Sequence, residues 1–293
     1  MTKEQPSLNQ SHVQKKSLTN NDFYFISGAL NSNTPICRYI NFDVFLNILE
    51  GEYWVQRRKG FEDANEKGEI PWAKRTAICY TGKDAPTPNP LHVKAENEKK
   101  DYEYLLLKKS MYLPTSCWTI DNGENYLMWK VYTNRCGVCI RTTIGELLDA
   151  IKYTDKGYLP VCSPLFYEGV SLKRSIVLSI LSKESFYSSE NEVRFYFIQN
   201  DDFVNEDLAN LDIDRFETLL EESIKKEAEK CENGNKEKDS ITFDVNTNFI
   251  NSIILSPFIN PSSVGYMKKL LQTTYPNIFN KTIIKESRIK INN

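Results

Sequence analysis

The sequence predicts an α+β fold, a single domain built on a mixed or antiparallel sheet with flanking helices. Three observations predict it. Strand-like apolar runs are short, other segments repeat apolar residues at helical spacing, and the two kinds do not alternate regularly along the chain. With 293 residues, of which 40% are hydrophobic and 12% aromatic, the chain can bury a large core.

The N-terminal residues 1–22 are rich in Ser, Asn, Gln and Lys. We expect them to form a disordered or loosely docked arm, which leaves residues 23–293 as the single domain. Strands are predicted at short apolar and β-branched runs, with a mixture of strand and turn at 158–167. The other predicted strands are 35–40, 53–55, 76–80, 111–119, 138–140, 193–198, 241–245, 252–255 and 282–285.

Helices are predicted where apolar residues recur three and four positions apart, at 42–50, 143–152 and 212–230. Asn41 is the expected cap of the first, and Gly51 its end. Asp121 and Glu124 have capping-box spacing ahead of a further helix around Met128. A charged helix at 94–109, an apolar one at 172–181 and one at 261–273 complete the set.

The formal net charge is only −2, from 37 basic and 39 acidic residues. This balance gives no global attraction to nucleic acid or to anionic lipid. Most basic clusters stand beside acidic residues, which is typical of solvated faces. Lys173 and Arg174, next to the apolar helix, are the exception and form a candidate anion site.

Seven cysteines stand mostly in apolar, strand-like runs. An odd number in such positions favours reduced core thiols over a disulfide framework. The N-terminal residues lack the apolar segment of a secretion signal, and no apolar run reaches the roughly 20 residues that cross a bilayer. We therefore expect a cytoplasmic protein with no membrane partner.

The sequence lacks the residues that several common catalytic, metal-binding and nucleotide-binding sites require. His12 and His92 are the only histidines, which argues against zinc sites and against histidine-dependent nucleophilic catalysis. Cys136 and Cys139 form an isolated CxxC with no second pair at zinc-site spacing. The glycine-rich motifs GxGxxG and GxxxxGK[ST], which bind dinucleotides and phosphates, do not occur.

The segment 190–197 carries the clearest candidate site. In a strand, Val193, Phe195 and Phe197 share one face, and Glu190, Glu192 and Arg194 share the other. The polar row is consistent with a solvated sheet face with cross-strand pairs, or with a cleft wall in which a carboxylate stabilises an oxocarbenium-like transition state.

Other polar groups allow two readings each. Glu124 is a helix-capping residue or a catalytic one. Ser116 satisfies local backbone groups or binds a ligand, and Arg38 is a surface residue or a phosphate ligand at a strand end. Trp129 is a core anchor or a stacking surface for a ring; as a core anchor, its replacement by Ala is expected to cost about 3–5 kcal/mol.

The motif order resembles a large, mostly bacterial family, the domain of unknown function 2971 family. The two most specific marks are Met128-Trp129-Lys130-Val131-Tyr132, with a Gly-x-x-Ile strand after it, and Glu190-Asn191-Glu192-Val193-Arg194. Further marks are Arg38-Tyr39-Ile40, Phe61-Glu62-Asp63, Ser116-Cys117-Trp118 and Lys173-Arg174. The resemblance covers roughly residues 35–257.

More distantly, this order is similar to that of ADP-ribosyltransferase-like folds, in which an arginine strand, a serine strand and a Glu-x-Glu follow one another. The resemblance implies that Glu192 stabilises the oxocarbenium and Glu190 orients the acceptor. It further implies a cofactor-binding set for NAD, with Arg38 at the diphosphate or ribose and Ser116 at the nicotinamide ribose. The full set is Arg38, Tyr39, Ser116, Trp118, Arg194, Lys173 and Arg174.

The activity so implied is NAD-dependent ADP-ribosyl transfer to a protein or nucleic-acid acceptor, or NAD glycohydrolysis, with NAD as substrate and no metal. Such an enzyme suits an effector in bacterial phage defence or a toxin system. A nearly isosteric Glu192→Gln is expected to abolish NAD consumption and leave the fold intact.

Two alternatives stay open: a non-enzymatic sensor or interaction module, and a metal-dependent nuclease-like effector using Glu124, Glu190 and Glu192. The position of Arg38 relative to Glu190 and Glu192 discriminates among these two alternatives and the NAD-dependent enzyme. A shared pocket favours NAD, a scattered arrangement favours the interaction module, and a carboxylate cluster with nothing to grip a diphosphate favours the metal.

Overall fold

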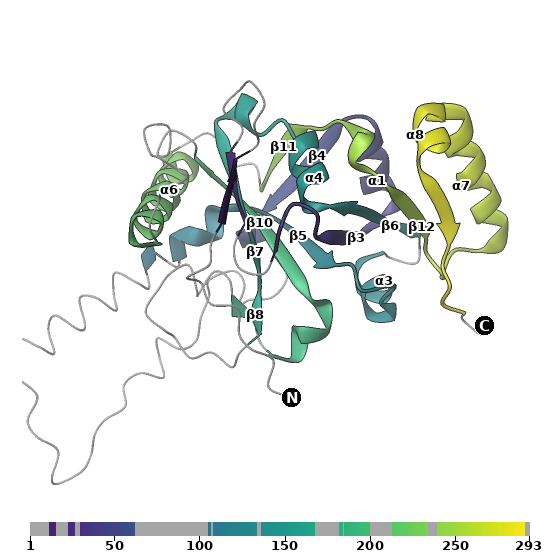
Figure 1. Cartoon of the computed structure of the whole chain (residues 1–293), viewed down its shortest axis with the longest axis horizontal. Helices are drawn as coiled ribbons and strands as arrows, with labels where there is room; N and C mark the ends of the chain where they lie inside the picture. Colours follow the sequence, from purple (N-terminus) through teal and green to yellow (C-terminus); the bar gives the residue numbers. More distant parts are fainter. Residues whose placement is uncertain are drawn as a thin grey trace, which may run out of the picture.

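The computed structural model describes residues 12–15, 23–26, 30–61, 105–106, 108–133, 136–167, 182–183, 185–199, 213–233 and 239–290. Within these ranges the chain forms a mixed sheet with helices on both faces (Figure 1). The single domain with a mixed sheet and flanking helices that the sequence predicts is thereby confirmed. The expected strand at 76–80, the helix at 172–181 and most of the helix at 94–109 lie outside the described residues.

The sheet follows one continuous path with a short branch. Its order is β1 (His12–Lys15), β2 (Phe23–Ile26), β7 (Tyr158–Pro164), β10 (Glu192–Gln199), β5 (Pro114–Ile120), β3 (Pro35–Asn41), β6 (Gly137–Thr143), β12 (Ser252–Leu255) and β13 (Ile283–Glu286). β4 (Glu52–Arg57) pairs with β5 and carries β11 (Ser240–Asp244). The β2–β7 and β12–β13 pairs are parallel, and the other pairs along the path and its branch are antiparallel.

The expected N-terminal arm contributes to this sheet. β1, within residues 1–22, pairs antiparallel with β2, and β2 continues the sheet beyond β7. The rest of residues 1–22 lies outside the described part of the chain. A separate two-stranded sheet joins β8 (Phe166–Tyr167) to β9 (Ser182–Lys183).

Strand β5 divides one of its edges between two partners. β10 pairs along the first edge, opposite residues 115–119. On the second edge β3 pairs only with Thr119 and Ile120, and β4 only with Pro114 and Thr115. The three residues between them, 116–118, therefore lie in a fork where β3 and β4 diverge.

Helices cover the two faces unequally. α1 (Phe42–Leu49), α4 (Ile144–Ala150), α7 (Pro261–Thr274) and α8 (Pro276–Lys281) place apolar residues in the main core. α3 (Tyr126–Tyr132) packs on the opposite face, in a second cluster with Tyr39 and Cys139. In Figure 1, α1 and α4 lie above the sheet and α3 below it. α6 (Ile213–Asn233) packs against β10 at the other end of the molecule from α7 and α8.

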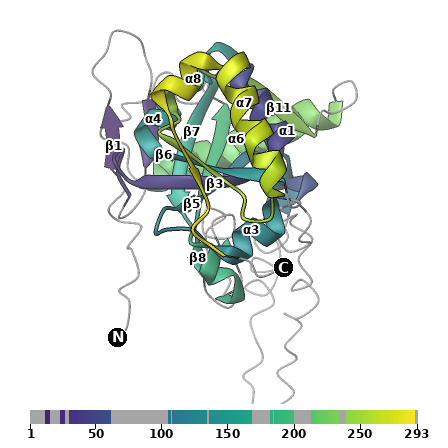
Figure 2. The same cartoon turned by 90° about the vertical axis from the view of Figure 1, so that its right-hand side faces the viewer.

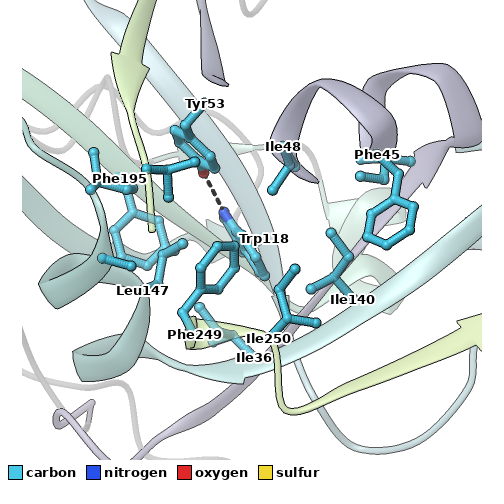
Figure 3. Close-up of a cluster of buried hydrophobic side chains, with 14 of the residues drawn as sticks. Ile36, Phe45, Ile48, Tyr53, Trp118, Ile140, Leu147, Phe195, Phe249 and Ile250 are labelled. Atoms are coloured by element: carbon cyan, nitrogen blue, oxygen red, sulfur yellow. Dashed lines mark hydrogen bonds between the residues drawn. The ribbon is translucent and has the colours of Figure 1, made fainter. Parts of the chain in front are cut away.

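The main core lies between the sheet and the larger helix layer (Figure 3). Val193, Phe195 and Phe197 of β10 face it and are fully buried, as strand alternation predicts. Trp118 of β5 lies at its centre, where its indole N–H reaches the Tyr53 hydroxyl at 2.9 Å. A buried tryptophan needs such a partner, so the pair fixes the start of β4 against β5.

The helix starts differ from two predictions. Asn41 stands at the cap position of α1, but its side chain makes no capping bond. α3 begins later than the Asp121–Glu124 spacing predicts, because Asn125 is its cap and accepts from Leu127 N and Met128 N. Asp121 instead closes a turn by accepting from Gly123 N and pairs with Arg141 at 3.0 Å. The turn delays the helix since Gly123 takes a φ of 114°, a conformation that glycine adopts readily.

Candidate functional site

The two most specific sequence motifs meet in space, although they lie 58 residues apart in the chain. The Tyr132 hydroxyl at the end of α3 donates to Glu190 Oε1 at 3.4 Å. At the start of the same helix, the Asn125 amide donates to the Ser189 carbonyl at 2.9 Å. The helix is thus attached at both ends to the segment that carries Glu190 and Glu192, and this junction forms the candidate site.

Glu190 and Glu192 reach the junction from different backbone conformations. β10 begins at Glu192, whereas Glu190 ends a 3-10 turn that spans Ser185–Glu190. Asn191 joins them with a φ of 47°, a left-handed conformation that asparagine tolerates better than most residues. The expectation of one continuous strand row therefore holds for Glu192 and Arg194, while a kinked residue brings Glu190 to the same side.

An ion network joins the two carboxylates. Lys183 Nζ lies 2.7 Å from Glu190 Oε2 and 3.1 Å from Glu192 Oε2. Arg194 Nε lies 2.6 Å from Glu192 Oε1. The side chains of Lys183, Glu192 and Arg194 are 6% exposed or less, and that of Glu190 is 14% exposed. The polar row is therefore not a solvated sheet face, and Glu190 is its most accessible carboxylate.

The pKa shifts of Glu192 and Tyr132 show which of these two groups is charged. Burial disfavours the charge on Glu192, but the guanidinium and hydrogen bond of Arg194, together with Lys183, outweigh it and lower the pKa of Glu192 to about 2. Burial and the negative charge of Glu190 raise the pKa of Tyr132. Glu192 is consequently ionised and held between two cations, and Tyr132 keeps the proton that it donates to Glu190.

Aromatic and thiol groups surround the network. Lys183 Nζ lies 4.4 Å from the centroid of the Tyr187 ring, and Arg194 Cζ lies 5.6 Å from that of Phe61. Cys117 stands directly opposite Arg194 on β5 and is partly exposed. Tyr132 itself is 41% exposed. Carboxylates, cations and π-faces thus occur together at the border between interior and surface.

A second group of predicted residues collects at the fork of β5. The Tyr53 hydroxyl lies 2.5 Å from Ser116 Oγ and accepts from the Trp118 indole N–H. The half-buried Arg38 guanidinium lies 5.7 Å from the Tyr53 ring centroid and 6.0 Å from that of Trp118, and Nη1 donates to the Tyr53 hydroxyl at 3.5 Å. Arg38, Ser116 and Trp118 therefore form one cluster around Tyr53.

The two groups lie on opposite faces of the sheet. Trp118 pairs with Val193, whereas Glu192 pairs with Thr119, so the register places Trp118 and Glu192 on different sides. Arg38 contacts the Trp118 side. Arg38 and Ser116 thus do not share a pocket with Glu190 and Glu192. An arrangement in which Arg38 grips a diphosphate beside Glu192 is incompatible with this geometry, and the separation favours a binding or interaction module over NAD cleavage.

The other predicted residues have structural partners. Tyr39 lies on the same sheet face as Glu192, packs edge-on against Trp129 with centroids 4.8 Å apart, and accepts from Asn125 N at 2.9 Å. Glu124 accepts from Trp129 Nε1 at 3.3 Å. Lys173 and Arg174 lie outside the described residues.

Sequence reasoning missed Lys183 and Tyr53, which organise the two clusters. Lys183 belongs to none of the motifs found in the sequence, so no local pattern indicates its role. Tyr53 could have been found from its place in a predicted strand. A tyrosine at an inward strand position buries its hydroxyl, which then needs a hydrogen-bond partner. Its partner Ser116 stood in a motif already singled out.

The three carboxylates of the metal-dependent alternative have other partners in the structure. Both Glu124 oxygens accept from nearby donors, and Glu190 and Glu192 are paired with Lys183 and Arg194. Over the described part of the chain, no group of three or more His, Cys, Asp or Glu side chains is arranged to hold a metal ion.

No family model, curated protein or solved structure matches this chain. Both resemblances stated from the sequence therefore stay predictions. Among the helices that the structure describes, none has the length and apolarity to span a membrane.

Proposed function

We propose that the protein binds a ribose-containing dinucleotide of the NAD class at the junction of α3 with the Glu190–Glu192 segment. The observation that carries the proposal is the contact between Tyr132 and Glu190, because it unites the two motifs at a partly exposed position. A carboxylate held in place by a lysine can accept the hydroxyl hydrogens of a ribose, as acidic residues do in other dinucleotide sites.

Glu190, rather than Glu192, is the carboxylate proposed to face the ligand. Glu192 Oε1 is held by Arg194 and Oε2 by Lys183, so its charge is already neutralised. Glu190 has one oxygen on Lys183 and the other on the exposed Tyr132. A cationic nicotinamide ring is attracted to both a carboxylate and the face of a tyrosine. If cleavage follows, Glu190 is the group placed to stabilise a developing oxocarbenium.

The test separates binding from turnover. Calorimetry with NAD measures binding, and chromatography of free nicotinamide measures cleavage. We expect wild-type protein to bind NAD, and Glu190→Gln and Tyr132→Phe each to weaken binding about tenfold, since each removes a hydrogen bond or a charge at the site. Glu229→Gln, which removes an exposed carboxylate on α6, is the matched control and should bind as wild type.

A further variant decides which face of the sheet is used. Arg38→Gln alters the cluster at the fork and leaves Glu190 untouched. Binding that is lost in Arg38→Gln and kept in Glu190→Gln would move the ligand to the opposite face and refute the proposed site. Absence of NAD binding by the wild-type protein would refute the ligand class.

A second candidate is a non-enzymatic sensor that uses the same site. The observation that favours it is the pairing of both carboxylates, Glu192 with Arg194 and Lys183 and Glu190 with Lys183, because a carboxylate so paired offers little charge to a transition state. NAD binding without nicotinamide release identifies the sensor, and release that disappears in Glu190→Gln identifies the enzyme. Transfer to a protein or nucleic-acid acceptor and a role in phage defence remain predictions.

A further inference from the structure

Glu124 stands just before α3 and accepts hydrogen bonds from three donors. Trp129 Nε1 of α3 donates to Oε2 at 3.3 Å, and the Arg288 backbone N–H donates to Oε1 at 2.8 Å. The Ser287 hydroxyl also donates to Oε2. Two of these donors belong to residues 287–290, which follow β13 and which we name the C-terminal strap. A carboxylate with three donors is held firmly, since hydrogen bonds to charged groups are among the stronger ones.

The strap lies against the same cluster as α3. Ile289 packs against the second core cluster, which contains Trp129, Tyr39 and Met128. Its N–H donates to Ser287 Oγ at 3.1 Å, which continues the chain of hydrogen bonds from Glu124. Figure 2 shows the chain running from β13 down to α3. The end of the described chain is thus fixed to the helix that carries the Met-Trp-x-x-Tyr motif.

We infer that Glu124 is a positioning residue: it fastens the C-terminal strap to α3 and so sets Tyr132 against Glu190. α3 has only seven residues, too few for a helix to be stable without its contacts. Its first turn is held by Asn125, which bonds Tyr39 and Ser189, and by Glu124. Loss of Glu124 therefore loosens the helix whose other end carries Tyr132.

Hydrogen exchange of the protein without ligand tests the structural half of this inference. In Glu124→Ala we expect amide exchange to quicken about tenfold both in 126–132 and in the strap, because three hydrogen bonds are lost. Glu286→Ala is the matched control: it removes an exposed carboxylate one residue before the strap, bonded to Lys268 and not to α3. It should leave exchange in α3 unchanged.

The outcomes are decisive in the absence of any ligand. Unchanged exchange in α3 of Glu124→Ala, with or without release of the strap, overturns the inference. If Glu124→Ala does not fold, exchange in α3 of Ser287→Ala decides, since this variant removes one donor to Glu124 and, within the strap, the acceptor of the Ile289 N–H. It should quicken exchange in the same two segments by a smaller factor, and Glu124→Gln, which keeps one carbonyl acceptor, should fall between wild type and Glu124→Ala.

The link from Glu124 to Tyr132 in ligand binding rests on the proposed function. A double-mutant cycle tests it: Tyr132→Phe should weaken NAD binding in wild type and have little further effect in Glu124→Ala. Additive losses would show that Glu124 does not act through Tyr132. Should wild-type protein not bind NAD, the proposed function fails, while the exchange measurement still decides whether Glu124 positions α3.

Discussion

The burial of Glu192 and its charged partners together determine the role of this residue. Its alternation with Val193 turns it away from the main core, yet it is buried, because the second face of the sheet is also covered. A buried carboxylate is tolerated only when paired, and Arg194 and Lys183 supply the pairing. The same pairing makes the residue a structural part of the site, so a substitution there changes stability as well as function.

Glu192→Gln is therefore expected to destabilise the protein, in contrast to the expectation from the sequence that it leaves the fold intact. Removing one partner of a buried ion pair typically costs about 3–5 kcal/mol, and here Arg194 and Lys183 would each lose a charged partner while they stay buried. Urea denaturation at neutral pH measures the loss. Glu190→Gln, at a more exposed position, should cost less, and equal losses in the two variants would contradict this account.

The pH dependence of stability follows from the same contact. The folded pKa of Glu192 is about 2, below its ordinary value of 4.5, so the ionised form stabilises the fold above pH 4.5. This contribution is lost as the pH falls from 4.5 towards 2. We expect the free energy of unfolding to fall more steeply over this range in wild type than in Glu192→Gln. Parallel curves from denaturation at a series of pH values would rule it out.

At the scale of single residues, part of the site could be predicted from the sequence. It separated Glu192 and Arg194 from Val193 and Phe195, because a two-residue period depends only on the strand. It did not find Lys183, since a lysine becomes a buried partner only through the chain path that brings β9 to β10. The contact between Arg38 and Tyr53 likewise depends on how β3 and β4 diverge.

At the scale of elements, α3 has an inner and an outer side. Trp129 is fully buried against Tyr39, whereas Val131, two residues along, is 64% exposed. We expect Trp129→Ala to lower the free energy of unfolding by about 3–5 kcal/mol, since it leaves a large cavity. Val131→Ala, in the same helix, should change it by about 0.5 kcal/mol or less.

Chemical denaturation of the two variants makes the comparison. A stability of Trp129→Ala close to that of wild type would refute the role of the ring as a core anchor. A large loss in Val131→Ala would show instead that the helix itself, rather than the indole, is sensitive to substitution.

Element ends were harder to predict than element types. The helices expected at 143–152 and 261–273 are found at 144–150 and 261–274, and the structure shows Thr143 and Asn260 as their caps. α3 was expected to start at Asp121, where the spacing of a capping box occurs by chance in a turn closed by Gly123. Local spacing cannot distinguish the two, since the choice of Asn125 depends on Tyr39 and Ser189.

For the whole molecule, the sequence predicted a mixed sheet but not its order. Short strands without regular alternation indicate α+β, and that indication rests on periodicity alone. The order of strands, and above all the fork on β5, is set by long-range pairing that leaves no local pattern. The fork is also the reason that Arg38 and Glu192 face different sides, so the location of the site could not be obtained without the fold.

The sheet order implies a gradient of stability across the molecule. β10 is buried along all eight residues and is paired on both edges, by β5 and β7. β13 is mostly exposed, and in the described part of the chain β12 is its only partner strand.

We expect amides of β10 to exchange only by global unfolding, with rates that rise as urea is added. Amides of β13 should exchange by local opening at rates that low urea leaves unchanged, because such an opening exposes little new surface. Hydrogen exchange followed by mass spectrometry at several urea concentrations measures both, and equal urea dependence of the two strands would show that the sheet opens as one unit.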